Sequence, residues 1–269
     1  MNRPSKAAVE RLSFKDESLL GGYAESIDRF AFAEYWCRGK KVLEAGCGTG
    51  SGARLLLEHG AESVLGIDYS NDAIREAREL QTSAAAEFMT GNLHDLARLT
   101  QAHAPFGAIV CFETLPHLHN PVRFLSAAAQ CMDSGAAFVV STPNRDAVPL
   151  DEVGRPLYRF QHTAYTVETL EELLREVFTE VGIWGQWLTP SGRLRRRRSE
   201  EQFAYLCDSY YQPSARLTRW VKRLMGRNTL PPPQNHSNAD AYPGDFQISL
   251  IDAARLPWMP TSLIAVCRN

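Results

Sequence analysis

Short apolar runs alternate along the chain with longer segments in which apolar residues recur at helical spacing. The first run leads into a glycine-rich turn, and a helical pattern follows the turn at once. This succession is repeated several times. Seven runs are expected to form strands, at residues 41–44, 63–67, 87–89, 108–111, 136–141, 180–187 and 262–267.

Helical segments separate most of these strands. Ser70 and Thr166 stand where N-caps are needed, directly before two of the helical segments. Parallel neighbours require crossover connections, and those crossovers cover the sheet. The alternation therefore predicts an α/β protein with a doubly wound, mostly parallel sheet. The connecting helices are expected at residues 53–59, 73–80, 121–132 and 167–178.

The order of the elements divides the chain into four parts. A helical pattern at residues 7–33 precedes the first strand and could pack over the carboxyl ends of the strands. The four parts are an N-terminal helical cap at 1–36, a core at 37–189, an insertion at 190–260 and a final core strand at 261–269.

The insertion differs in character from the rest of the chain. It contains an arginine run at residues 193–198, many aromatic residues and three prolines at 231–233. We interpret it as a lid on the acceptor side or as an interaction surface. Its arginines could hold an acidic or phosphorylated acceptor, because guanidinium groups match phosphate oxygens. The alternative is a solvated basic loop.

Composition excludes several classes of protein. A chain of 269 residues with 44% hydrophobic and 22% charged residues fits one large packed domain with an appendage. Its net charge of -2 argues against a global positive field that attracts nucleic acid or an anionic membrane. The six cysteines form no C-x-x-C pair, and neither a signal peptide nor a membrane span is evident. We expect a reduced, cytoplasmic protein.

Three alternate glycines, Gly46, Gly48 and Gly50, follow the first expected strand and precede a helix. Bare backbone at this place lets a ligand approach the helix N-terminus. A dinucleotide fingerprint needs a third glycine at its sixth position, which here is Ser51, so a nicotinamide cofactor is disfavoured. Asp68 ends the second strand and can accept hydrogen bonds from ribose hydroxyls. Together these features favour a nucleoside ligand.

The chain resembles the class I S-adenosylmethionine-dependent methyltransferases in four motifs, taken in order. It looks most like the bacterial branch with ubiquinone-pathway O-methyltransferases and methyltransferases of cell-surface sugar pathways. The resemblance implies S-adenosylmethionine as cofactor and a Rossmann-like, seven-stranded sheet whose last strand is antiparallel. The motifs are V-L-E-A-G-C-G-T-G (42–50), V-L-G-I-D-Y-S (64–70), F-G-A-I-V-C-F-E-T-L-P-H-L (106–118) and S-T-P-N-R (141–145).

The resemblance also implies roles for single residues. Glu44 and the loop of Gly46, Cys47, Gly48 and Gly50 would hold the methionine portion of the cofactor. Asp68 would bind the ribose, with Tyr69 beside the adenine, and Arg29 would lie near the cofactor carboxylate. The remaining expected cofactor contacts are Asn92, which stands where the family has aspartate, its neighbour Leu93, and Phe112 on the pocket floor.

His117 is the candidate catalytic residue. It follows the fourth strand, at the edge where ligands of open α/β folds bind, and histidine suits a general base near neutral pH. The alternative is a histidine that only supports the loop. Some relatives bind a metal with an E-x-x-E-H motif, but Pro116 replaces the second acid here. Glu113, His117 and His119 would be three scattered ligands, and we expect no metal.

A second segment, residues 159–166, also resembles the family, but its histidine is displaced by one position. The family histidine aligns with Gln161 and the family glutamate with Ala164, so His162 is one place out of register. Tyr165 matches the family, and with Tyr158 it could line the acceptor pocket or simply belong to the core.

The sequence as a whole predicts transfer of a methyl group to a hydroxyl of a small-molecule or sugar acceptor. One alternative is an RNA methyltransferase that uses the arginines at 193–198. The acidic net charge and the scarcity of lysine in that run argue against nucleic acid. A second alternative is a catalytically silent cofactor-binding or scaffold protein. The oligomeric state stays open.

Overall fold

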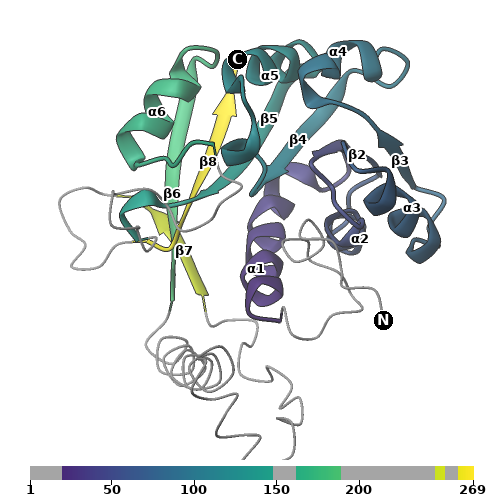
Figure 1. Ribbon diagram of the computed structural model, residues 1–269, viewed down its shortest axis with the longest axis horizontal. Coiled ribbons are helices and arrows are strands. Elements are labelled where there is room, and N and C mark those ends of the chain that lie inside the picture. Colours follow the sequence, from purple (N-terminus) through teal and green to yellow (C-terminus); the bar gives the residue numbers. More distant parts are fainter. Residues whose placement is uncertain (1–19, 148–161, 189–245, 252–259) are drawn as a thin grey trace, which may run out of the picture.

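The computed structural model describes residues 20–147, 162–188, 246–251 and 260–269. In this part of the chain, eight strands form one sheet in the order β3-β2-β1-β4-β5-β8-β6-β7 (Figure 1). The strands are β1 Lys41–Ala45, β2 Ser63–Asp68, β3 Ala86–Thr90, β4 Phe106–Phe112, β5 Met132–Pro143, β6 Glu180–Leu188, β7 Phe246–Leu250 and β8 Ser262–Arg268.

The pairing confirms the predicted fold class. Strands β3, β2, β1, β4 and β5 are parallel neighbours, and β8 runs antiparallel to both β5 and β6. All seven predicted strands are present, and the last is antiparallel as expected. The sheet has one further strand, β7, which pairs antiparallel with β6 at the edge. Strand β7 comes from within the segment 190–260 that the sequence marked as an insertion.

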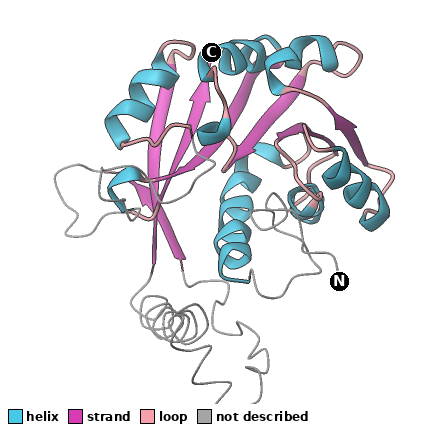
Figure 2. Ribbon diagram, viewed as in Figure 1, coloured by secondary structure: helices cyan, strands magenta, loops and turns pink. Residues whose placement is uncertain are grey.

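Helices cover both faces of the sheet (Figure 2). The predicted caps are confirmed, since Ser70 Oγ accepts from the N–H of Ala73 and Thr166 forms a capping box with Thr169. The helix expected to reach residue 132 ends at Gln130, because the chain enters β5 at Met132. The α-helices are α1 Leu20–Cys37, α2 Ser51–Glu58, α3 Asn71–Leu80, α4 Leu96–Leu99, α5 Pro121–Gln130 and α6 Val167–Arg175, and the 3-10 turns are η3 Leu93–Asp95, η4 Leu115–His117 and η5 Arg145–Ala147.

Two hydrophobic clusters, one on each face, hold these layers together. Successive strand residues point to opposite faces, so Leu43 and Ile109 join the cluster under α5 and α6. Val42 and Val110 join the other cluster, under α1 and α2. The five cysteines in the described part of the chain are free and buried. Within the same residues, no helix combines the length and apolar character that crossing a membrane requires.

The strand order places the site. The chain runs from β1 outward to β2 and β3, and then returns to β4 on the other side of β1. The connections that follow β1 and β4 therefore lead to opposite halves of the sheet. In open α/β folds, a ligand-binding crevice forms at the carboxyl ends of two such strands. Helix α1 contributes Phe30 and Ala33 to the core beside this edge. Most of the predicted insertion, including the arginines at 193–198, lies outside the described residues.

Leu125 tests the importance of the α5 interface. It is fully buried in α5, whereas Leu80 at the end of α3 is 36% exposed. Leu125→Ala should lower the free energy of unfolding by about 2–5 kcal/mol, because it removes buried methyl groups and leaves a cavity. The same change at Leu80 should cost about 1 kcal/mol or less. Denaturant titration measures both, and equal losses would contradict this packing.

Candidate active site

The loop between β1 and α2 carries the three glycines of the first motif, and all three have left-handed backbone angles. Their φ angles are 84° at Gly46, 53° at Gly48 and 80° at Gly50. A Cβ at position 46 would overlap the Thr114 side chain, so Gly46 lets the loop pack against the segment after β4. A Cβ at position 48 would instead enter open space. The backbone of Gly48 therefore borders a volume that a ligand can enter.

Asp68, the last residue of β2, is hydrogen-bonded to this loop. Its Oδ2 accepts from the backbone N–H of Gly48 at 3.0 Å, and its Oδ1 accepts from the N–H of Ser70 at 2.9 Å. The residue is 8% exposed. Each carboxylate oxygen keeps a second acceptor position. Asp68 can thus hold the loop and still accept hydrogen bonds from a ligand.

Glu44, in β1, is a buried carboxylic acid with one oxygen that lacks a partner. The residue is 5% exposed, and its Oε2 has no hydrogen-bond partner among the described residues. Burial, and then the negative charge of Asp68, raise the pKa of Glu44 to about 8, although the N–H of Ala53 acts in the opposite direction. A cation placed beside Glu44 would therefore stabilise its ionised form.

The other predicted contacts of the nucleoside lie on separate loops. Tyr69 is 74% exposed, directly after β2. Asn92 Oδ1 accepts from the N–H of His94 at 3.0 Å and so caps the short turn η3, in which Leu93 is buried. Phe112 ends β4 and meets Phe30 of α1 in an edge-to-face contact at 5.0 Å.

Cys47, inside the glycine loop, is 4% exposed. Burial, followed by the charges of Glu44 and Asp68, raises the pKa of its thiol well above the usual range. The thiol is therefore a packing group under the loop and no nucleophile.

Arg29 reaches from α1 to the carboxyl edge of the sheet. It is 4% exposed, and its Nη1 lies 3.3 Å from carboxylate oxygens of both Glu25 and Glu113. The same nitrogen donates to Gln186 Oε1 at 3.1 Å and to Ser262 Oγ at 3.3 Å. By contrast, Nε has no partner among the described residues. The Nη1 side of the guanidinium is therefore crowded, whereas the Nε side has a donor without an acceptor in the described part of the chain.

Glu113 follows β4 and is the one non-glycine residue with a positive φ, 53°, in the described ranges. Its Oε1 accepts from Ser141 Oγ at 2.8 Å. Burial raises its pKa, and the nearby charge of Arg29 opposes that effect. The side chain nevertheless keeps 35% of its surface exposed. The sequence had suggested Glu113 only as a metal ligand, and nothing in the local pattern revealed its contacts with Arg29 and Ser141.

His117 lies in η4, half-buried, on the same loop. Its charge, when present, lowers the pKa of Glu113, so the two side chains are electrostatically coupled. His117 is thus at the predicted edge of the sheet, beside a carboxylate that Arg29 holds. This position fits a proton acceptor at the mouth of the crevice.

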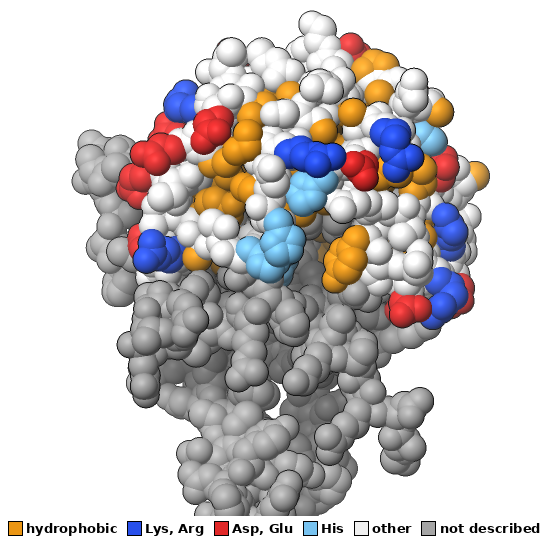
Figure 3. Space-filling view, turned by 45° about the horizontal axis from the view of Figure 1, so that its top comes forward, with side chains coloured by type: hydrophobic (Ala, Val, Ile, Leu, Met, Phe, Trp, Pro, Cys, Tyr) orange, Lys and Arg blue, Asp and Glu red, His pale blue; other side chains and the backbone are white. Residues whose placement is uncertain are grey.

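The neighbouring histidines take a different arrangement from a metal site. Among the described residues, no three His, Cys, Asp or Glu side chains gather where they could share a metal ion. His119 instead stacks on His162, with ring centroids 3.9 Å apart. The N–H of His162 donates to the carbonyl of Pro116 at 2.8 Å and attaches the second segment to this loop. Figure 3 shows histidine side chains near the middle of one face, next to basic and apolar side chains.

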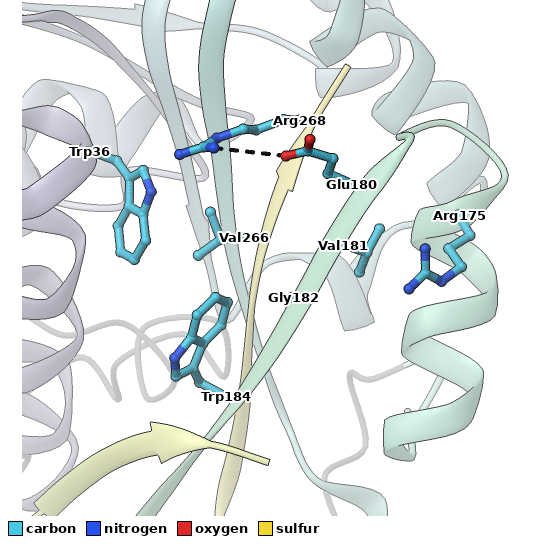
Figure 4. A pocket seen from close by; sticks show the side chains of 8 residues that line it. All are labelled: Trp36, Arg175, Glu180, Val181, Gly182, Trp184, Val266 and Arg268. Atoms are coloured by element: carbon cyan, nitrogen blue, oxygen red, sulfur yellow. Dashed lines mark ion pairs between the residues drawn. The ribbon is translucent and has the colours of Figure 1, made fainter. Parts of the chain in front are cut away.

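Two further features lie outside the crevice. Tyr165 is 3% exposed within the core, so its role is in packing and it does not line an open acceptor pocket. Tyr158 falls outside the described residues. A hollow of about 400 Å³ lies between Trp36, Trp184 and the Glu180–Arg268 ion pair (Figure 4). It contains neither the glycine loop nor Asp68, and we assign the chemistry to the crevice.

Comparison with known proteins identifies the family of the chain. A family model described as "Methyltransferase domain" matches residues 16–204. The chain is 32% identical over 190 residues to a "Probable S-adenosylmethionine-dependent methyltransferase" of Mycolicibacterium smegmatis, which covers 67% of this chain and 70% of that relative. It is 33% identical over 145 residues to a "Ubiquinone biosynthesis O-methyltransferase" of Psychrobacter arcticus, covering 51% of this chain and 53% of the relative. The chain thus spans about half the length of that O-methyltransferase.

Solved structures show the same fold at low identity. An S-adenosylmethionine-dependent methyltransferase from Mesorhizobium loti has a TM-score of 0.54 and 20% identity, covering 93% of this chain and all of the other. The [4+2]-cyclase SpnF also has a TM-score of 0.54, with 17% identity, covering 91% of this chain and 81% of the other. The fold alone therefore does not determine the reaction. Because the family model covers most of the chain and the M. smegmatis relative matches two thirds of it, this protein belongs to the methyltransferase domain family and is an S-adenosylmethionine-dependent enzyme.

Proposed function

We propose that the enzyme methylates a hydroxyl of a small-molecule or sugar acceptor, and that the crevice beside the glycine loop holds its cofactor. The observation that carries this proposal is the buried Glu44 carboxyl group, which has an unpartnered oxygen and senses the charge of Asp68, the carboxylate that accepts from Gly48. A buried acid of this kind is costly unless a donor or cation reaches it. The ammonium group of S-adenosylmethionine supplies such a partner.

The other contacts can be assigned by the same chemistry. Asp68 has acceptor positions left for the ribose hydroxyls. The unpartnered Nε of Arg29 fits the cofactor carboxylate, since guanidinium edges bind carboxylates well. Tyr69, Asn92 and Leu93 would border the adenine.

The cofactor supplies a methyl group activated by attachment to positively charged sulfur. The protein mainly has to orient the acceptor oxygen towards that methyl group. His117 would accept the proton of the acceptor hydroxyl as the oxygen takes the methyl group, whose bond to sulfur would break and leave a neutral thioether. Phe112 and Phe30, in edge-to-face contact, would form an apolar floor that excludes water.

The acceptor class rests on weaker support than the cofactor. A hydroxyl acceptor is favoured by the likeness to the ubiquinone-pathway O-methyltransferase over about half of each chain. An RNA acceptor would depend on the arginines at 193–198, which lie outside the described residues. A structure with the same fold is named a [4+2]-cyclase, so the fold is compatible with other reactions. A catalytically silent cofactor-binding protein stays the alternative.

Incubation with methyl-labelled S-adenosylmethionine and a bacterial metabolite extract tests the proposal. We expect a labelled small-molecule product, absent when Gly48→Val replaces the wild type. Labelled RNA would favour the nucleic-acid alternative. Cofactor binding without any labelled product would favour the silent protein.

Asp68 and Gly48 provide the direct test of the cofactor site. Asp68→Ala should weaken S-adenosylmethionine binding by about 1–3 kcal/mol, because a charged acceptor for two hydroxyls is lost. Gly48→Val should weaken it more, since a branched side chain would enter the open space and resist a φ of 53°. Calorimetry on folded protein measures both affinities. Unchanged affinity in both variants would refute the site.

Glu44 should make cofactor binding release a proton. The free protein keeps Glu44 protonated below a pKa of about 8, and a bound ammonium group would favour the ionised form. At pH 6.5 binding should therefore release up to about one proton, and affinity should rise with pH towards about 8. Calorimetry in two buffers of different ionisation enthalpy counts the proton. The same release from Glu44→Gln would show that another group is responsible.

His117→Gln should lower turnover by about 10²–10⁴-fold with the acceptor found in the extract, while cofactor affinity stays the same. A general base acts on the acceptor proton and does not contact the adenosine. Steady-state kinetics and calorimetry separate the two effects. A loss of less than about tenfold would assign His117 to support of the loop.

A further inference from the structure

Arg29 is shared by two carboxylates, and the group keeps a net negative charge. Glu25 and Glu113 each place an oxygen 3.3 Å from the same guanidinium nitrogen. The other contacts of that nitrogen, Gln186 and Ser262, are neutral. When both carboxyl groups are ionised, the single guanidinium leaves one uncompensated negative charge at the carboxyl edge of the sheet.

Glu113 is the most exposed member of this group, and it follows β4 at the carboxyl edge of the sheet. Its side chain retains 35% exposure, against 20% for Glu25 and 5% for Arg29. The next residue, Thr114, packs where a Cβ of Gly46 would lie, so the Glu113 backbone adjoins the glycine loop. Because Glu113 is next in sequence to Phe112, it also borders the proposed floor of the site. Glu113 thus lies in sequence between the proposed floor and the residue that packs on the cofactor loop, and its carboxylate senses the charge of His117.

The Glu113 backbone is held in a conformation that a non-glycine residue rarely adopts. Its N–H donates to the carbonyl oxygen of Ser141 at 3.1 Å and lies 3.2 Å from Ser141 Oγ, while the Ser141 hydroxyl donates to Glu113 Oε1 at 2.8 Å. A φ of 53° costs free energy that the surrounding contacts must offset. Strain of this kind occurs preferentially at functional sites, where it directs a side chain.

The charge matters because the methyl donor and its product differ in charge. S-adenosylmethionine carries a sulfonium, an ammonium and a carboxylate, whereas S-adenosylhomocysteine has lost the sulfonium charge. The ribose, the adenine, the ammonium and the carboxylate are common to both. A fixed negative charge near the reacting end would therefore favour the donor over the product, while contacts to the common parts would favour neither.

We propose that Glu113 is a specificity-determining residue whose carboxylate selects the cationic methyl donor over the neutral product, and that Arg29 and Ser141 position it. The proposal rests on the proposed cofactor site and adds to it a means of favouring product release. Arg29 acts only through Glu113 in this respect, because its own contact with the cofactor carboxylate would be the same in donor and product.

The test is the ratio of two dissociation constants. S-adenosylmethionine and S-adenosylhomocysteine are titrated separately by calorimetry into the full chain, as wild type and as Glu113→Gln. We expect the Kd of the donor to rise by about 3–10-fold, the effect of one charge at several ångströms in a partly screened site. The Kd of the product should change by less than about twofold. A purely structural role would raise both constants alike.

Two control variants calibrate the ratio. Asp68→Ala should raise both constants by the same factor, because the ribose is common to both ligands. Glu180→Gln removes a carboxylate at the start of β6 and should change neither constant. Glu180 lies six residues before Gln186, which separates the two residues by about 20 Å along the strand. Glu113→Asn is the second variant, because asparagine tolerates a left-handed backbone. It should reproduce the selective loss seen with glutamine.

Equal changes for donor and product in both Glu113 variants, or no change for either, would overturn the role of Glu113 alone. A wild-type protein that binds neither ligand would overturn the proposed cofactor site and this proposal with it. The two failures are thus distinguished by the wild-type titration.

Discussion

The hydrogen bond from the Gly48 backbone to the Asp68 carboxylate joins the loop after β1 to the end of β2, and the candidate site depends on that connection. The loop can reach Asp68 only because Gly46, Gly48 and Gly50 adopt positive φ angles that other residues resist. The same loop packs against Thr114 after β4. Three neighbouring strands thus end at one small loop, and the backbone of that loop borders the open space at Gly48.

Three carboxyl groups lie near the ends of β1, β2 and β4, and burial raises the pKa of two of them, Glu44 and Glu113. Glu44 is buried with an unpartnered oxygen, and its pKa is raised to about 8. Asp68 contributes to that shift, while Glu113 is held by Arg29 and Ser141. The negative charges of Glu44 and Asp68 oppose one another unless a cation is added. The arrangement is therefore suited to a cationic ligand, and a sulfonium cofactor with an ammonium group meets that requirement.

Helix α1 contributes to both the core and the site. Phe30 and Ala33 pack into the cluster shared with α2, while Arg29 turns towards the carboxyl edge of the sheet. Its guanidinium contacts β6 through Gln186, β8 through Ser262 and the end of β4 through Glu113. Removing Arg29 would leave Glu25 and Glu113 without their shared cation, which is destabilising. The position of the helix and the charge of the crevice are consequently coupled.

The sequence by itself determined the elements and indicated the centre of the candidate site. Apolar positions predicted the seven strands, and Ser70 and Thr166 predicted two helix caps. The glycine spacing, together with Asp68, indicated a nucleoside site. Each of these signals is local in the chain. The tertiary structure decided the rest. Strand β7 forms because β6 offers an open edge, and Tyr165 is buried because the core encloses it. Arg29 meets partners 157 and 233 residues away, and no local pattern encodes a contact that arises only when the sheet brings distant segments together.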